Sequence, residues 1–171
     1  EAMGKYARSM MKLTPEMISE SKELLKAMGI AVYQAAGEGE MQCAELVKSG
    51  QAYAVASQDY DALVVGAPRL IQNLTLSRKR KTPSGYVYIA PELIEYSKVL
   101  NELGIDPDQL ISLAILVGTD FNPGGVHGIG PKKAITLVQQ KKYPALIFKE
   151  VEERIDFNWQ EVFEIFKKPN V

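Results

Sequence analysis

The sequence predicts an α/β fold with a mostly parallel sheet, followed by a C-terminal part made of helices. Two observations support this: short apolar segments alternate with helical patterns up to about residue 121, and helical patterns dominate after it. With 171 residues and a hydrophobic content of 46%, the chain is long enough to bury one sizeable core. We therefore expect three parts: residues 1–13, an α/β core over 14–121, and a helical part over 122–171.

The first half of the core is predicted to form a strand, a helix and a second strand. Thr14-Pro15-Glu16 supplies a hydroxyl cap and a proline at the first helical position, and the helix that follows ends at Gly29. Short apolar segments over 30–33 and 52–56 are expected strands, with a helix over about 38–48 between them. Two strands joined by a helix through short links are typical of a parallel pair with a right-handed crossover.

Two further strands and a helix are expected in the second half of the core. Strands over 70–76 and 86–89 flank a basic turn that contains the sequence Arg-Lys-Arg-Lys at 78–81. A helix over about 91–103 ends at Gly104. The cationic turn is typical of a solvated loop, although sequence-independent binding of nucleic acid would also use it.

Helices are expected over most of the remaining chain. Asp106 should cap a helix over about 109–117, with a proline and a glutamine that complete the capping pattern. This helix is apolar on nearly every face, so it should lie in the core. A glycine hairpin leads to a helix that ends near Gln140, and residues 144–168 should form two amphipathic helices divided near 156–158.

Charge and cysteine usage limit the class of protein. The net charge is −1, from 20 Lys and Arg against 21 Asp and Glu, so overall basicity gives no argument for a nucleic-acid partner. Cys43 is the only cysteine, which excludes an intrachain disulfide, and it is expected in the core. The longest apolar stretch, 110–117, is far too short to span a bilayer. We expect an intracellular protein with no membrane partner, cytoplasmic or nucleoid-associated in a prokaryote and nuclear in a eukaryote.

Five acidic residues form three clusters, each placed where an apolar segment ends. They are Glu38 and Glu40, Asp59 and Asp61, and Asp120. Acids at strand ends meet at one rim of a parallel sheet, and a core helix can bring a third group there. Carboxylates that converge repel one another unless a divalent cation lies among them. Each cluster also has a local alternative: turn and cap residues for the aspartate pair, favourable charges at a helix N-terminus for the glutamates, and a loop residue for Asp120.

The ligand chemistry of such a site favours Mg²⁺, with Mn²⁺ as a substitute. Oxygen ligands suit these ions, and the chain has no set of Cys and His to hold zinc. Two such ions can activate a water and stabilise the leaving oxygen of a phosphodiester. His127 is the only histidine and has no evident nucleophile beside it, so a Ser–His–Asp hydrolase is disfavoured. His127 is expected as a solvated or phosphate-facing loop residue.

A glycine hairpin, Gly-Ile-Gly at 128–130, is followed directly by Pro-Lys-Lys. Bare backbone amides, a helix N-terminus and cations one turn away can together bind phosphate without reading bases. The candidate residues for binding a phosphate backbone are therefore His127, Gly128, Gly130, Lys132 and Lys133. The alternative is a plain turn between two helices.

Five motifs along the chain form a recognisable set. They are Glu38-Gly39-Glu40, Ala56-Ser57-Gln58-Asp59-Tyr60-Asp61, Gly66-Ala67-Pro68-Arg69, Ile115-Leu116-Val117-Gly118-Thr119-Asp120 and Gly128-Ile129-Gly130-Pro131-Lys132-Lys133. In order and spacing they resemble the flap endonuclease family of structure-specific 5′ nucleases. The match covers most of the chain, and the sequence Asp-Phe-Asn-Pro-Gly-Gly at 120–125 resembles the archaeal branch.

The resemblance implies a PIN-like three-layer αβα fold, a helix-hairpin-helix motif within 122–171, and two Mg²⁺ ions. It also implies endonuclease and 5′ exonuclease action on DNA where a 5′ flap joins duplex, in replication and repair. By position, the five acids correspond to the family's metal ligands. Residues 128–133 correspond to the hairpin that holds the duplex backbone, often through a bound K⁺. Residues 1–13 resemble the end of the family's helical arch, which makes Lys5 and Arg8 candidate catalytic residues that stabilise charge in the transition state.

The chain departs from the family's pattern at both ends. The resemblance implies an N-terminal segment with two more active-site aspartates and a C-terminal tail that docks on the sliding clamp, and this sequence contains neither. We therefore expect a portion of a flap endonuclease, weak or inactive alone, with no small-molecule cofactor. Two alternatives stay open: a non-catalytic module that binds the DNA backbone, and a 5′ exonuclease or Holliday-junction resolvase of the same superfamily.

Overall fold

The structure is a computed structural model that describes residues 13–74, 79–83 and 85–171. The chain forms two compact units, residues 1–34 and 35–171. In the first unit, helix α2 (Pro15–Ala27) begins as predicted: the Thr14 hydroxyl accepts the N–H of Met17 at 3.3 Å, and a proline opens the first turn. The candidate residues Lys5 and Arg8 lie outside the described residues.

The strand predicted over 30–33 is not formed, so the prediction of a strand-helix-strand unit there was wrong. A strand is stable only when a neighbouring strand satisfies its backbone groups. Such a partner for 30–33 is not found among the described residues. The parallel pair in this protein is made instead by β1 (Val55–Ala56) and β2 (Arg69–Gln72), which both belong to the second unit.

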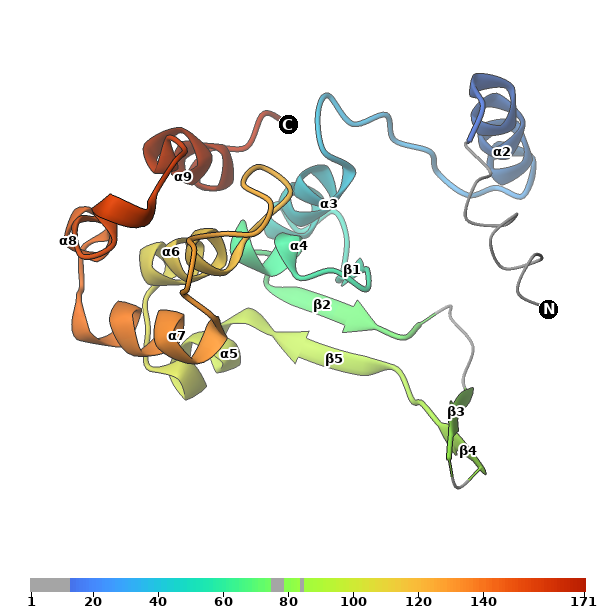
Figure 1. The fold of residues 1–171 in the computed structure, drawn as a ribbon. Coiled ribbons are helices and arrows are strands. Elements are labelled where there is room, and N and C mark those ends of the chain that lie inside the picture. The colour runs from blue at the N-terminus through green and yellow to red at the C-terminus, as the bar shows by residue number, and fades with distance from the viewer. Residues whose placement is uncertain (1–12, 75–78, 84) are drawn as a thin grey trace. The chain divides into compact units, whose positions relative to one another are not determined.

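The sheet of the second unit is small and mixed, whereas a mostly parallel one was expected. Its order is β1-β2-β5 (Figure 1), and β5 (Glu92–Glu95) runs antiparallel to β2 with Leu70 opposite Ile94. Residues 92–95 were predicted as helix, but pairing with the buried strand β2 overrides that local pattern. Helix α5 (Tyr96–Leu103) begins only after β5.

The basic run lies partly in a strand and not in a turn. Strands β3 (Lys79–Thr82) and β4 (Gly85–Tyr88) form an antiparallel hairpin, so three of the four cationic residues at 78–81 belong to β3. Arg78 is outside the described residues. The expected strand over 70–76 ends earlier, at Gln72, where β2 stops.

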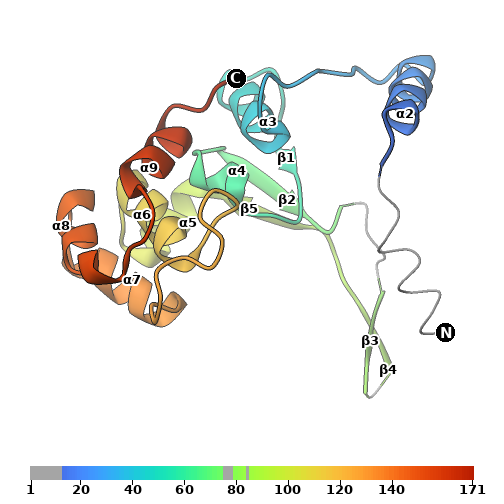
Figure 2. The ribbon, with the colours of Figure 1, turned by 45° about the horizontal axis from the view of Figure 1, so that its top comes forward.

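Helices build the rest of the second unit around α6, as Figure 2 shows. Helices α3 and α4 pack on each other, α3 contacts β1, α4 contacts β2, and α6 packs against α4, α7, α8 and α9. These helices, with the short 3₁₀ helix η1, span α3 (Gly39–Lys48), α4 (Asp61–Val64), α6 (Pro107–Val117), α7 (Pro131–Gln140), α8 (Pro144–Lys149), η1 (Glu152–Arg154) and α9 (Trp159–Lys167). No helix covers 155–158, between η1 and α9, which agrees with the break predicted near 156–158.

Helix α6 is the buried helix that the sequence predicted. Ile115 and Leu116 are fully buried. At its start, Asp106 Oδ1 accepts the N–H of Gln109 at 2.9 Å, and Gln109 Oε1 accepts the N–H of Asp106 at 2.8 Å. This reciprocal capping box satisfies backbone donors that would otherwise be left without partners in the core.

Cys43 is exposed, so the expected core thiol was wrong. Helix α3 buries Met41, Ala44 and Val47, which lie three residues apart on one face, and Cys43 falls outside that spacing. Across the described residues, no helix combines the length and the apolar character needed to cross a bilayer.

Candidate metal centre

The structure brings the five predicted carboxylates to one pocket. This pocket has a volume of about 170 Å³ and is lined by Glu38, Glu40, Met41, Asp59, Asp61, Asp120 and Phe121. The acids come from three separate places: the start of α3, the β1–α4 connection and the segment after α6. Their convergence is therefore a property of the tertiary fold, because Glu40 and Asp120 are 80 positions apart in the sequence.

Helix α3 positions the two glutamates. Glu38 is the N-cap residue and Glu40 lies in the first turn. Negative charge is favourable at this end of a helix because the backbone N–H groups point toward it. The buried face of α3 fixes the helix on the core, so both glutamates are held at the rim of the pocket.

The β1–α4 connection carries the aspartate pair. Asp61 opens α4, and burial of Ala62 and Leu63 anchors that helix. The Ser57 hydroxyl donates a hydrogen bond to Glu40 Oε1 and accepts the N–H of Asp59 at 3.1 Å. Ser57 therefore links the glutamate cluster to the aspartate cluster.

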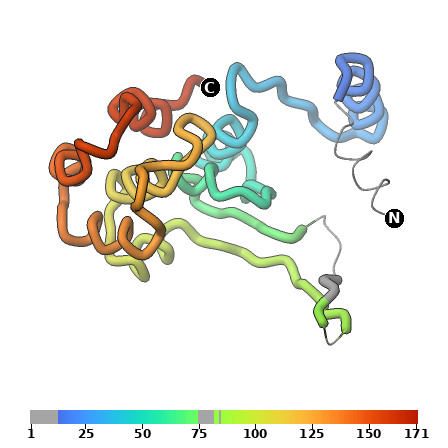
Figure 3. Tube along the Cα trace, viewed as in Figure 1, coloured from blue at the N-terminus to red at the C-terminus, as the bar shows by residue number. Residues whose placement is uncertain are grey.

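The segment after α6 presents Asp120. Asn122 is buried, and its Nδ2 donates to the carbonyl of Ile115 at 2.7 Å. The Thr119 hydroxyl donates to Asn122 Oδ1 at 2.6 Å, and the ring of Phe121 packs edge-on against Phe166 with 5.6 Å between centroids. Figure 3 traces this segment from α6 to α7. Contacts on both sides of Asp120 thus hold it at the end of the core helix.

The carboxylates of the pocket repel one another. The pKa of Asp61 is raised, first by burial and then by the negative charges of Glu40, Asp120, Asp59 and Glu38, in that order. Glu40 Oε2 is buried and has no hydrogen-bond partner among the described residues. A buried carboxylate oxygen without a partner is costly, and a bound cation removes that cost.

The oxygen donors of the pocket are of the kind that binds a divalent cation, although the five carboxylates line the pocket without converging on a single point. Oxygen donors line the pocket, and one of them is buried without a partner, as at sites for Mg²⁺ or Mn²⁺. Within the described residues, no three His, Cys, Asp or Glu side chains are grouped closely enough to hold an ion as they stand.

Ser57 is a residue of this site that the sequence reasoning did not single out. Its signals were its place in the motif over 56–61 and a hydroxyl two residues before Asp59, where a strand ends. We expect Ser57→Ala to weaken Mn²⁺ binding about tenfold, because residues that orient metal ligands typically contribute 10- to 100-fold in affinity. Calorimetric titration with Mn²⁺ checks this. Ser57→Thr keeps the hydroxyl and should bind nearly as the wild type does, whereas equal losses in both variants would contradict the role of the hydrogen bonds.

The glycine hairpin forms a second, separate feature. Gly130 is the N-cap of α7, and a pocket of about 630 Å³ is lined by Gly128, Gly130, Pro131, Lys132 and Lys133. Lys133 Nζ donates to the carbonyl of Gly128 at 3.1 Å, so this ammonium braces the hairpin. His127 is exposed and is not part of the pocket's lining.

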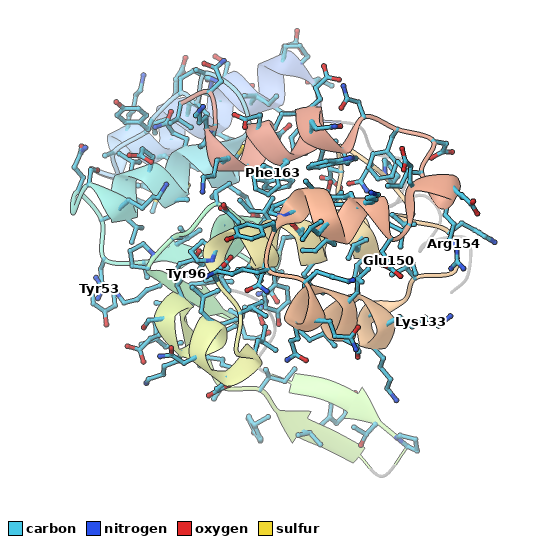
Figure 4. All side chains as sticks on the ribbon, turned by 90° about the vertical axis from the view of Figure 1, so that its left-hand side faces the viewer. Tyr53, Tyr96, Lys133, Glu150, Arg154 and Phe163 are labelled. Carbon is cyan, nitrogen blue, oxygen red and sulfur yellow. The ribbon has the colours of Figure 1, made fainter. Side chains whose placement is uncertain are left out.

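Arg154 adds a cation that the sequence reasoning missed. Its Nη1 atom lies 3.7 Å from the position that a Cβ on Gly128 would occupy. Figure 4 labels Arg154 and Lys133, which extend from η1 and α7. In the sequence, Arg154 directly follows two glutamates, so the charge of this segment did not indicate a cationic site. Folding thus adds Arg154 to the cations around the hairpin.

Comparison with known proteins gives consistent matches. The family model of the XPG I-region matches residues 29–120, which include all five carboxylates. Flap endonuclease 1 of Staphylothermus marinus is 50% identical over 174 residues, an alignment that covers 100% of this chain and 50% of that protein. The structure of flap endonuclease-1 from Methanococcus jannaschii matches with a TM-score of 0.81 and 42% identity, covering 99% of this chain and 49% of that one.

A more distant solved structure is human GEN1 in complex with Holliday junction DNA. It matches with a TM-score of 0.66 and 31% identity, covering 95% of this chain and 43% of that one. The chain spans about half the length of the curated relatives it matches.

Proposed function

This chain belongs to the family defined by the XPG I-region, and on that premise we propose that it supplies the metal-binding carboxylates of a structure-specific 5′ nuclease that cuts branched DNA. The observation that carries the proposal is the pocket in which Glu38, Glu40, Asp59, Asp61 and Asp120 converge. Flap endonucleases are the relatives with the highest identity named above, so a 5′ flap is the first substrate to test.

The carboxylates would hold the divalent ions, and the residues around them keep the ligands in place. Divalent cations bound there would supply activation of a water and stabilisation of the leaving oxygen of a phosphodiester. Ser57 holds Glu40 and the backbone of Asp59 by hydrogen bonds. Asn122 keeps the segment that carries Asp120 against α6.

The hairpin before α7 would bind the DNA backbone outside the metal centre. The N-terminus of α7 offers backbone N–H groups, and exposed Lys132 lies in its first turn. Arg154 adds positive charge beside Gly128. Contacts of this kind grip phosphates of any sequence, as expected for an enzyme that recognises the shape of a junction.

One experiment separates the two sites and tests the function. We expect Asp120→Ala to lower Mn²⁺ affinity at least tenfold by calorimetry, while affinity for 5′-flap DNA in EDTA stays unchanged. Lys132→Ala should leave Mn²⁺ affinity unchanged and lower DNA affinity. It should also reduce the slope of log affinity against log salt concentration by about the amount expected for one phosphate contact. Cleavage of the same flap with Mg²⁺, compared with a Holliday junction, then ranks the substrates.

The outcomes distinguish the proposal from its alternatives. Wild-type protein that binds flap DNA but shows no Mn²⁺ binding at millimolar concentration would favour a non-catalytic DNA-binding module. Equal Mn²⁺ affinity in the wild type and Asp120→Ala would exclude Asp120 as a metal ligand. Stronger cleavage of the junction than of the flap would point to a resolvase.

A further inference from the structure

A buried glutamine lies beside the connection that carries Asp59 and Asp61. Gln72 is the last residue of β2 and has only 9% of its surface exposed. β1 and β2 are parallel with Ala56 opposite Ile71, so Gln72 lies next to the point where the chain leaves β1. The N–H of Ser57 donates to the carbonyl of Ile71 at 3.2 Å and continues this pairing.

Both the nitrogen and the oxygen of the Gln72 side-chain amide form hydrogen bonds with the connection between β1 and α4. Its Nε2 donates to the carbonyl of Gln58 at 2.9 Å, and its Oε1 accepts the hydroxyl of Tyr60 at 3.2 Å. The two contacts lie on either side of Asp59 in the sequence. The buried side chain of Gln72 therefore holds the backbone of Gln58 and the side chain of Tyr60, the two residues next to Asp59.

Tyr60 connects the hydrogen bonds of Gln72 to Asp61. Its carbonyl accepts the N–H of Leu63 at 2.8 Å, in the first turn of α4, which Asp61 opens. Its side chain is 56% exposed and lines a pocket of about 500 Å³ that shares Asp59, Asp61 and Asp120 with the metal centre. Tyr60 is thus anchored at its hydroxyl and presented at the rim of the site.

On the premise that the carboxylates hold a divalent cation, we propose that Gln72 and Tyr60 are positioning residues that fix Asp59 and Asp61 for metal binding. A glutamine amide suits this role because it donates and accepts at once, and a backbone carbonyl can only accept. The orientation of the amide is therefore set by Gln58. Hydrogen-bonding residues behind metal ligands tune affinity without touching the ion.

Two variants test the pair, with a matched control. Gln72→Met keeps the length of the side chain and removes both hydrogen bonds, whereas Tyr60→Phe removes one and leaves the core untouched. Gln109→Met is the control, because Gln109 is also buried and its amide also bonds to backbone, to the carbonyls of Val138 and Lys141. Gln109 lies in the first turn of α6, whereas Asp120 follows the last residue of this helix.

Two measurements on the 171-residue chain are needed. Gln72→Met should speed amide hydrogen exchange over 57–61 in metal-free protein and lower Mn²⁺ affinity about tenfold, and Tyr60→Phe should show smaller changes in the same direction. Gln109→Met should lower thermal stability without changing either quantity. Unchanged exchange, or faster exchange with unchanged Mn²⁺ affinity, would overturn the positioning role while the proposed function stood. A wild-type chain that binds no Mn²⁺ would overturn both.

Discussion

Replacing Asp61 with asparagine should make the metal-free protein more stable at neutral pH and at the same time lower its Mn²⁺ affinity by at least tenfold. Burial and the four neighbouring carboxylates raise the pKa of Asp61, so its charged form destabilises the fold when no cation is present. Asparagine has nearly the same shape and carries no charge. Strain of this kind is common at functional sites, where stability is lower than the fold alone would allow.

The sign of the pH dependence follows from the direction of the pKa shift. Because the pKa of Asp61 is higher in the folded than in the unfolded state, the folded protein binds more protons between the two values. The contribution of Asp61 to the free energy of unfolding therefore falls as pH rises from the ordinary aspartate range, about 3.9, through the raised pKa. The stability difference between Asp61→Asn and the wild type should grow over that window and then level off.

Metal should reverse the order of stability. Mn²⁺ at about 100 times its dissociation constant adds roughly 2.7 kcal/mol to a protein that binds it only when folded. Urea denaturation with and without Mn²⁺ measures this, and the wild type should overtake Asp61→Asn when metal is added. Asp156→Asn, at an exposed aspartate outside the pocket, is the matched control and should show no crossing. If Mn²⁺ stabilised Asp61→Asn as much as the wild type, Asp61 would not be a ligand.

Among the glycines that the structure describes, Gly125 should tolerate replacement by alanine least. Gly125 has φ +62°, and a Cβ there would lie 2.4 Å from the carbonyl carbon of Val117 and 2.5 Å from the carbonyl oxygen of Leu116. These are backbone atoms of α6 and cannot move aside. Overpacking and the left-handed backbone together should cost about 3 kcal/mol or more. This corresponds to a fall in melting temperature of roughly 10 °C for a domain of this size.

The same change should also weaken metal binding. The N–H of Val126 donates to the carbonyl of Leu116 at 2.9 Å, which draws Gly125 onto the end of α6. A side chain at 125 would push this segment away and displace Asp120. Gly124→Ala is the matched control, since Gly124 has φ +87° but nothing within 4 Å of its Cβ position. Thermal denaturation and Mn²⁺ titration of both variants separate the effect of the steric clash from that of the left-handed backbone. Equal losses of stability and Mn²⁺ affinity in the two variants would contradict the close approach of Gly125 to α6.

Local signals in the sequence were sufficient for the starts of the two helices that carry a capping pattern. Thr14 before Pro15 marked the start of α2, and Asp106 with Gln109 marked the start of α6, because capping depends on residues a few positions apart. The apolar character of α6 also predicted its burial. These features need no knowledge of the rest of the fold.

Strand assignments failed where the partner strand decided the outcome. Residues 92–95 carry a helical pattern but pair with β2, while residues 30–33 look like a strand and form none in the described structure. A strand gains its hydrogen bonds from another segment, so a single-sequence pattern cannot show whether that segment is available. The mixed sheet follows from the same cause.

By itself, the sequence determined the kinds of ligand and their order along the chain: five carboxylates at the ends of apolar segments, and no cysteine–histidine set. Only the tertiary structure decided that all five face one pocket, that Ser57 and Gln72 brace the connection carrying Asp59, and that Arg154 lies beside Gly128. The reason is physical. Residue chemistry is encoded position by position, whereas distances between side chains depend on how the core packs and brings distant segments together.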